Sequence, residues 1–251
     1  MSDPLISAKH VSLAYPGGPP VVSEIELELG AGELVIVLGP NGGGKTTLFR
    51  GLSGELPVAG GSLEVNAQVA ELAQHDGTRL DFPVSARDVV LMGTLARRRI
   101  WQRAGRADRD AADDALALVG LTDRAADSFG ELSGGQRRRV LLARTIVAGA
   151  PILLLDEPLA GVDPASADVI KDSLRRLADG GRLVVVASHD VDHARRADRV
   201  VCVNGRVIAS GTPDEVLTEP ILRATYADDL TVLHDERGEP VFAATDCHHD
   251  H

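Results

Sequence analysis

A glycine-rich stretch near the amino terminus has the residue types and spacing of a phosphate-binding loop. Gly39, four further residues and then Gly44-Lys45-Thr46 match the pattern G-x-x-x-x-G-K-[ST]. Glycines let successive backbone N–H groups turn inward around an anion, because they carry no Cβ. Lys45 would add a positive charge beside the phosphates, and Thr46 a hydroxyl ligand for Mg²⁺. The residues predicted to bind a nucleoside triphosphate are Gly39, Pro40, Asn41, Gly42, Gly43, Gly44, Lys45, Thr46 and Thr47.

The flanking residues favour this interpretation over a glycine-rich turn that matches by accident. The apolar run 34–38 has the length and β-branched character of a buried strand, and residues 46–52 have helical character. A helix that begins at the loop would direct its positive amino-terminal end at the phosphates.

Two adjacent carboxylates further along the chain could serve the hydrolysis of such a nucleotide. Asp156 and Glu157 directly follow the apolar run 152–155, which predicts a buried strand. Asp156 would hold the hydration shell of Mg²⁺, and Glu157 would orient or deprotonate the attacking water. The alternative is a strand followed by an ordinary polar turn.

A second anion-binding pattern precedes these carboxylates. Small residues at the start of a predicted helix expose backbone N–H groups to an anion. One nucleotide bound to one P-loop does not need a second such helix end from the same chain. We therefore expect Ser133 and Gly135 to reach the γ-phosphate bound by a second copy of the protein, although a simple helix cap is the alternative. The residues of this pattern are Leu132, Ser133, Gly134, Gly135 and Gln136.

The surrounding sequence predicts the elements that would position these residues. Alternating apolar and polar residues over 5–29 predict a half-exposed antiparallel sheet, and 62–65 with 69–73 predict a strand pair that ends at Gln74. Residues 83–148 have helical character. Strands and helices then alternate, and the apolar run 183–187 ends at Ser188-His189-Asp190. This pattern predicts an α/β fold.

Composition excludes several classes of function. The net charge of −11 argues against non-specific binding of nucleic acid. Cys202 and Cys247 are the only cysteines, so no disulfide framework is expected and a reducing cytosol is the default. The apolar runs are strand-length, and the amino terminus has no basic, apolar signal sequence. We expect any membrane association to come through a partner.

Together, in this order, the motifs resemble those of the ATP-binding subunit of an ABC transporter, over about residues 5–233. The resemblance implies that Asp156 and Glu157 are the Walker B aspartate and the catalytic glutamate. Gln74 would be a second catalytic residue and, with Thr46 and Asp156, a Mg²⁺ ligand. The remaining family roles fall on Tyr15 (adenine stacking), Asp163 (D-loop) and His189 (switch histidine, catalytic).

The resemblance also implies the fold class and the partners. We expect a P-loop NTPase core of ABC type, with an antiparallel β subdomain and an inserted α-helical subdomain at about 83–148. The ATP-binding domain would span 1–235 and a flexible His-rich tail 236–251. The expected enzyme is an ATPase that uses ATP and Mg²⁺ as a homodimer, at the cytoplasmic face of the cell membrane. It would drive an integral membrane permease, serve an extracytoplasmic solute-binding protein indirectly, and bind no nucleic acid.

Within the family, three stretches resemble the zinc and manganese importer group: 42–44, 81–93 and 159–163. The ATPases of siderophore, haem and cobalamin importers are alternatives, as is a soluble ABC ATPase that transports nothing. The last class usually has two ATP domains or a long coiled coil, whereas this sequence has one P-loop and no sustained heptads. Two residues depart from the family pattern: Ala73 replaces a proline, and Arg138 a glutamine or lysine.

The end of the chain contains residue types that bind Zn²⁺. A weak, pH-dependent zinc site is the functional hypothesis, because imidazole and thiolate are ligands that Zn²⁺ prefers. The alternative is a disordered polar terminus, since contiguous residues do not easily close a tetrahedral site. The candidate ligands are Cys247, His248, His249 and His251.

Overall fold

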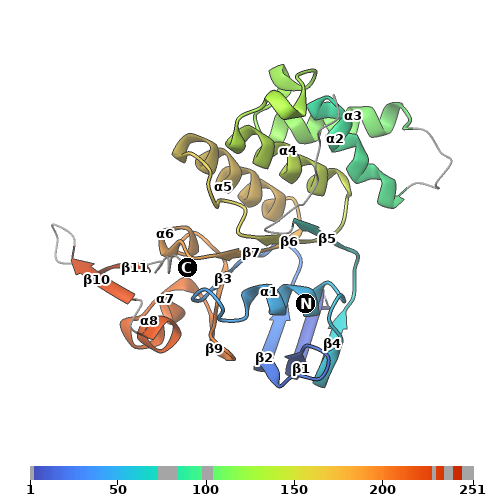
Figure 1. Cartoon of the computed structure of the whole chain (residues 1–251). Coiled ribbons are helices and arrows are strands. Elements are labelled where there is room, and N and C mark those ends of the chain that lie inside the picture. Colours follow the sequence, from blue (N-terminus) through green and yellow to red (C-terminus); the bar gives the residue numbers. More distant parts are fainter. Residues whose placement is uncertain (1–2, 73–83, 98–103, 228–229, 235–239, 245–251) are drawn as a thin grey trace.

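A parallel sheet organises the molecule (Figure 1). The computed structural model describes residues 3–72, 84–97, 104–227, 230–234 and 240–244. The six strands follow the order β5-β6-β7-β3-β8-β9, and only the last pair is antiparallel. Their bounds are Leu34–Leu38 (β3), Val69–Leu72 (β5), Ile152–Asp156 (β6), Leu183–Ser188 (β7), Arg199–Val203 (β8) and Val207–Gly211 (β9).

Side chains of β3 point alternately into two hydrophobic cores, one on each face of the sheet. Leu34, Ile36 and Leu38 pack into the core formed with the helices Ala86–Met92 (α2), Arg106–Leu118 (α3), Gly134–Val147 (α4) and Pro164–Asp179 (α5). Val35 and Val37 pack into the core formed with the helix Lys45–Leu52 (α1) and the antiparallel sheet. All five are at most 2% exposed. This burial on both faces explains the continuous apolar run 34–38.

The antiparallel sheet covers the second core in the order β2-β1-β4. Its strands are Ile6–Ala14 (β1), Pro20–Leu29 (β2) and Val58–Val65 (β4). The alternation in β2 places Ile25, Leu27 and Leu29 in the core, as the sequence predicts. The predicted pairing of 62–65 with 69–73 is wrong, because β4 pairs with β1 and β5 pairs in parallel with β6.

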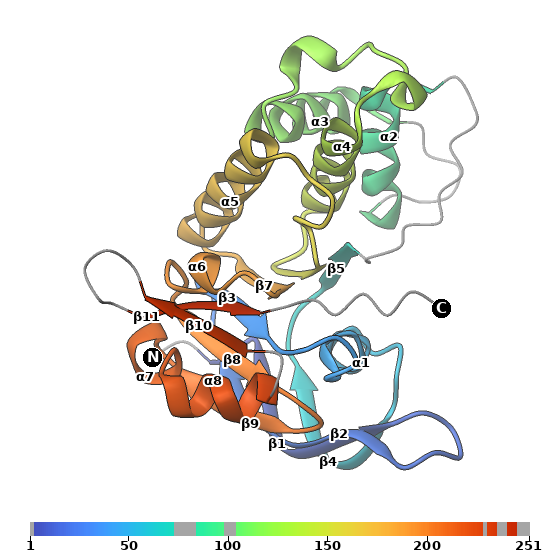
Figure 2. The ribbon, with the colours of Figure 1, turned by 60° about the vertical axis from the view of Figure 1, so that its left-hand side comes forward.

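Helices cover the other face of the sheet (Figure 2). Side-chain capping boxes define the amino ends of two of them, at Ser85 for α2 and Ser133 for α4. The chain forms this helical layer after β5 and before β6. Its elements are Ala86–Met92 (α2), Gly93–Arg97 (η1), Arg106–Leu118 (α3), Thr122–Arg124 (η2), Phe129–Glu131 (η3) and Gly134–Val147 (α4).

The remaining elements follow the sheet strands. The helices are Lys45–Leu52 (α1), Pro164–Asp179 (α5), Val191–Ala194 (α6), Pro213–Val216 (α7) and Glu219–Tyr226 (α8). Strand β10, Leu230–His234, pairs antiparallel with β11, Pro240–Ala244. The expectation of a flexible tail over 236–251 is therefore wrong for residues 240–244, where backbone pairing with β10 forms a strand.

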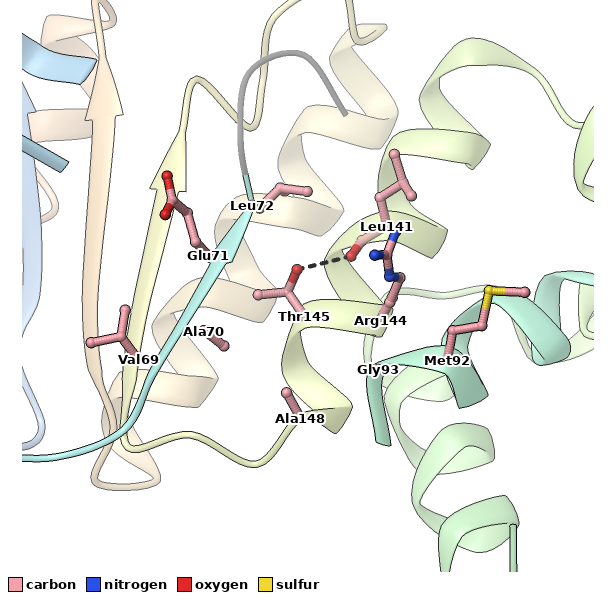
Figure 3. A pocket seen from close by; sticks show the side chains of 10 residues that line it. All are labelled: Val69, Ala70, Glu71, Leu72, Met92, Gly93, Leu141, Arg144, Thr145 and Ala148. Carbon is pink, nitrogen blue, oxygen red and sulfur yellow. Dashed lines mark hydrogen bonds between the residues drawn. The ribbon is translucent and has the colours of Figure 1, made fainter. Parts of the chain in front are cut away.

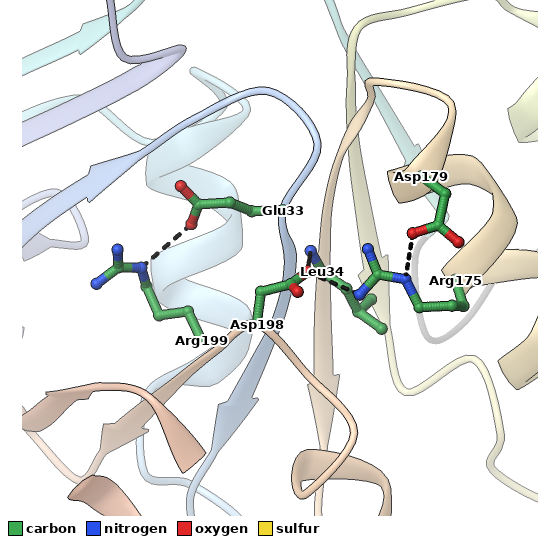
Figure 4. Close-up of polar contacts among 6 residues, drawn as sticks. All are labelled: Glu33, Leu34, Arg175, Asp179, Asp198 and Arg199. Atoms are coloured by element: carbon green, nitrogen blue, oxygen red, sulfur yellow. Dashed lines mark hydrogen bonds and ion pairs between the residues drawn. The ribbon is translucent and has the colours of Figure 1, made fainter. Parts of the chain in front are cut away.

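An ion-pair network fixes the amino end of β3 to α5 and β8 (Figure 4). Asp198 Oδ2 accepts hydrogen bonds from the Leu34 N–H and from Arg175 Nη1, both at 2.7 Å. Arg175 also bonds Asp179 at 2.8 Å, and Arg199 Nε bonds Glu33 Oε2 at 3.2 Å. The carboxylate of Asp198 thus satisfies a backbone donor and a guanidinium together, which holds β3 in place behind its loop.

A buried histidine makes the stability of the fold depend on pH. His193 is 2% exposed, and neither ring nitrogen has a hydrogen-bond partner among the described residues. Burial, together with the positive charge of Lys171, lowers the pKa of His193 to about 4. Below pH 6.5 the unfolded chain therefore binds a proton that the folded chain does not.

Acidification from pH 7 to pH 5 should lower the free energy of unfolding by about 2 kcal/mol through this group. Urea unfolding at the two pH values measures the change. His193→Phe should flatten the pH dependence, because phenylalanine does not titrate. His189→Phe is the matched control, since His189 is exposed and its replacement should retain the slope. An equal slope in wild type and His193→Phe would contradict this prediction.

Candidate phosphate-binding site

The loop between β3 and α1 has a backbone that tolerates no side chain at two positions. Gly44, the residue before α1, has a φ of 101°, and a Cβ there would overlap the side chain of Val22. A Cβ on Gly39 would overlap the carbonyl of Val203. Both glycines are therefore required for the close approach of the loop to β2 and β8, in addition to their predicted role around phosphate.

Lys45 is a buried cation at the centre of this loop. Its side chain is 6% exposed, and Nζ donates to the carbonyls of Gly39 at 2.7 Å and Pro40 at 3.1 Å. Nζ also lies 3.9 Å from Oε1 of Glu157. A buried ammonium within the loop is a strong attractor for a phosphate group, because little solvent screens it.

Thr46 and Asp156 are brought together by the fold although they are far apart in the sequence. The Thr46 hydroxyl donates to Asp156 Oδ2 at 2.8 Å, and Asp156 is 3% exposed. A hydroxyl and a carboxylate are hard oxygen ligands, so this pair fits Mg²⁺. The third predicted ligand, Gln74, lies outside the described residues.

Glu157 follows β6 in an unusual backbone conformation. Its φ is 48°, in the left-handed region, which costs on the order of 1–3 kcal/mol for a residue other than glycine. Its N–H donates to the Ala187 carbonyl of β7 at 3.1 Å, and its side chain is 13% exposed. The carboxylate therefore lies beside Lys45 with limited access to water.

His189 lies at the same edge of the sheet. Strands β3, β6 and β7 are adjacent and parallel, so the loop, Glu157 and His189 all follow their carboxyl ends. His189 is exposed. The next residue, Asp190, is fixed by Lys171 Nζ at 2.8 Å and caps α6 through the His193 N–H at 2.9 Å. The segment that carries His189 is thus anchored to α5.

Tyr15 lies beside α1, a position that no local sequence pattern predicts. Its hydroxyl is 3.4 Å from Thr47 Oγ1 and accepts from Arg50 Nη1 at 3.1 Å. The Arg50 guanidinium lies 5.9 Å from the centre of the ring, and Tyr15 is 39% exposed. Arg50 is a contact that the sequence analysis missed, because no motif marks the side of α1 that faces the ring.

The second predicted anion-binding pattern forms the amino end of α4. Ser133 Oγ accepts from the Gln136 N–H at 3.2 Å, and Gln136 Oε1 accepts from the Ser133 N–H at 2.9 Å. Ser133 and Gly134 are exposed, and the first turn contains no acidic residue. Gly135 is instead buried against the start of α5, where a Cβ would crowd Asp163 and Ser166.

Asp163 connects this helix end with α5. Its Oδ1 caps α5 by accepting from the Ser166 N–H at 3.0 Å, and a Cβ on Gly135 would lie 2.6 Å from its Oδ2. Hydrogen bonds from the Ser166 N–H and hydroxyl lower the pKa of Asp163. The aspartate therefore stays ionised next to the amino end of α4.

The loop and the start of α4 belong to opposite faces of the sheet. Leu48 and Phe49 of α1 pack into the core with the antiparallel sheet, whereas Val140 and Leu142 of α4 pack into the core with the other helices. Figures 1 and 2 both show α1 and α4 on different sides of the sheet. The structure therefore brings Lys45, Thr46, Asp156 and Glu157 together but keeps Ser133 apart from them.

The predicted zinc ligands of the tail lie outside the described residues. In the part of the chain that the structure describes, no group of three or more His, Cys, Asp or Glu residues could hold a metal ion. The tail site therefore stays a prediction.

Comparisons with known proteins agree with these features. A family model described as ABC transporter matches residues 22–160. The manganese transport system ATP-binding protein MntB of Bacillus subtilis is 36% identical over 240 residues, covering 92% of this chain and 96% of the relative. The zinc transport system ATP-binding protein TroB of Treponema pallidum is 33% identical over 242 residues, covering 93% and 91%. A chain of an inward-facing, metal-chelate type ABC transporter is 26% identical with a TM-score of 0.84, covering 97% and 98%.

Proposed function

The chain belongs to the ABC transporter family as an ATP-hydrolysing subunit, and we propose that it drives the import of a divalent metal, manganese or zinc. The names of the two relatives carry the choice of metal, because both match more than nine-tenths of this chain at more than 30% identity. Relatives named as transport-system subunits also favour transport over a soluble ABC ATPase that moves no solute.

The proposed roles within one subunit follow from the geometry at the carboxyl edge of the sheet. Lys45 and the loop amides bind the β- and γ-phosphates. Thr46 and Asp156 hold Mg²⁺, which neutralises phosphate charge when it is bound. Glu157 orients the attacking water, and His189, at the same edge of the sheet, would contact the γ-phosphate. Tyr15, partly exposed beside α1, supports the adenine.

The proposed ATP site is completed by a second copy of the chain. The amino end of α4 has two exposed small residues, Ser133 and Gly134, and a positive helix end, yet it lies on the opposite face of the sheet from the loop. In a two-fold homodimer, each Ser133 end would contact the nucleotide held by the partner's loop. Asp163, beside Gly135, would lie at the same interface.

A cleft between the sheet edge and the helical layer is the proposed docking site for the permease (Figure 3). Its volume is about 270 Å³, and exposed apolar side chains lie nearby, with Met92 36% and Leu95 57% exposed. None of the described helices is long and apolar enough to cross a membrane. The chain would therefore sit at the cytoplasmic face of the membrane, bound to an apolar segment of the permease, and would serve a solute-binding protein through it. The lining residues are Val69, Ala70, Glu71, Leu72, Met92, Gly93, Leu141, Arg144, Thr145 and Ala148.

The proposed metal is tested by the ATPase activity of the complete transporter. The chain is co-expressed with its permease, reconstituted in lipid nanodiscs with the solute-binding protein, and assayed at constant Mg²⁺. Mn²⁺ or Zn²⁺ should stimulate ATP hydrolysis several-fold, because transport and hydrolysis are coupled. A complex carrying Glu157→Gln should show no stimulated turnover with any solute.

The metal-chelate type transporter among the similar structures supports a second candidate, the import of a metal chelate. The same assay separates the two candidates when a ferric siderophore, haem and cobalamin are added in parallel. Stimulation by one of these chelates, with none by the free ions, would show that the transported solute is the chelate and not the divalent metal.

A further inference from the structure

Arg138, in the second turn of α4, binds the backbone at the end of β6. Its Nη2 donates to the carbonyls of Asp156 at 3.0 Å and Glu157 at 2.9 Å, and its Nε donates to the carbonyl of Pro158 at 3.3 Å. The three consecutive carbonyls of residues 156–158 therefore share one guanidinium. It reaches them from α4, on the face of the sheet opposite to α1.

The backbone that Arg138 binds is the one that needs external support. Glu157 has a φ of 48°, a conformation that persists only where neighbouring groups hold it. Within the strand region, its N–H bonds the Ala187 carbonyl at 3.1 Å, and its own carbonyl also accepts from the Ala160 N–H at 3.1 Å. Arg138 adds bonds to the carbonyls of both peptide groups that flank the Glu157 Cα.

An arginine suits this position better than the residues that the family pattern favours. The planar guanidinium has five N–H donors in a fixed fork, so it can bind several carbonyls while keeping one orientation. Glutamine has two donors on a shorter side chain, and lysine carries three donors on a single nitrogen. Arg138 is also half-buried, so water competes weakly for these carbonyls.

We propose that Arg138 is a positioning residue that holds the Glu157 backbone in its strained conformation and so sets the direction of the Glu157 carboxylate. The inference rests on the proposed role of Glu157 in ATP hydrolysis. Ser133 caps the amino end of α4, which in the proposed dimer faces the partner's nucleotide. The Arg138 side chain thus connects this helix to Glu157, which in the proposal acts on the subunit's own nucleotide.

The test compares three variants in steady-state ATPase assays. Arg138→Met removes all the donors while keeping an extended apolar side chain, and should lower kcat on the order of tenfold with an unchanged KM. Arg138→Lys keeps the positive charge and places three donors on one nitrogen, so it should recover part of the loss. Arg139→Met is the matched control, because Arg139 likewise binds carbonyls, those of Val119 at 3.1 Å and Gly120 at 3.4 Å, but just after α3. It should lower Tm to a similar extent and keep kcat.

The same changes made together with Glu157→Gln separate positioning from a general loss of structure. The ATP-bound dimer should form as well with Arg138→Met as without it, because the phosphate contacts are untouched. An unchanged kcat, or a fall in kcat matched by an equal loss of this dimer, would overturn the inference. Failure of the proposed function would be distinguishable, since the Glu157→Gln single variant would then form no ATP-bound dimer at all.

Discussion

Replacing Glu157 with glutamine should produce a protein that binds ATP but hydrolyses it on the order of a hundredfold or more slowly. The amide keeps the size of the side chain but cannot accept a proton from the attacking water. The contacts of Lys45 with the loop and of Thr46 with Asp156 do not involve the Glu157 side chain, so ATP and Mg²⁺ binding should survive. The variant should therefore accumulate as an ATP-bound dimer in size-exclusion chromatography.

Asp156→Asn is the matched control for this prediction, because it changes the neighbouring carboxylate in the same way. Asp156 is buried and bonded to Thr46, so its amide should weaken the binding of Mg²⁺ and with it the ATP-bound dimer. The two variants should thus both lose turnover but differ in dimer formation. Turnover of Glu157→Gln near the wild-type rate would show that another group orients the water.

The sequence predicts that these residues meet at one edge of the sheet, because each of them is locally marked. Lys45 and Thr46 lie in a motif between a strand and a helix, and Asp156 with Glu157 ends a strongly apolar strand. Parallel strands bring their carboxyl ends to one edge, so their proximity could be expected before the strand order was known.

Other parts of the fold depend on contacts between distant segments and leave no local pattern. Strands β4 and β5 have similar short, partly apolar sequences, yet one joins the antiparallel sheet and the other the parallel sheet. Their partners, β1 for β4 and β6 for β5, come from distant parts of the chain, so the local sequence does not predict them. The strand β11 was missed for a related reason, because it forms through pairing with β10, which no local motif marks.

The contacts of Arg138 and Gly135 also could not be predicted from the sequence. Arg138 was recognised only as a departure from the family pattern, and its three carbonyl partners come from a segment about twenty residues away. Gly135 was predicted to contact phosphate, whereas its buried position is explained by the close approach of α5. A single residue type can satisfy a motif and a packing requirement together, and only the structure separates the two.

Mixing two inactive variants should restore ATPase activity if, as we propose, each ATP site is built from two chains. Lys45→Ala removes the loop cation, and Ser133→Arg places a bulky side chain at the exposed start of α4. The lost helix cap should cost about 1 kcal/mol, which leaves the fold intact. In a heterodimer, one site contains both changes and the other contains neither. With random pairing and independent sites, the mixture should reach about a quarter of the wild-type activity.

ATP retained by the heterodimer tests the shared site most directly, since it does not require the two sites to hydrolyse independently. The two variants are given different affinity tags, combined with Glu157→Gln, mixed, and purified through both tags in the presence of ATP. We expect about one ATP per heterodimer and little ATP-bound dimer in either variant alone. A mixture that forms no more ATP-bound dimer than its two components would contradict a site shared between subunits.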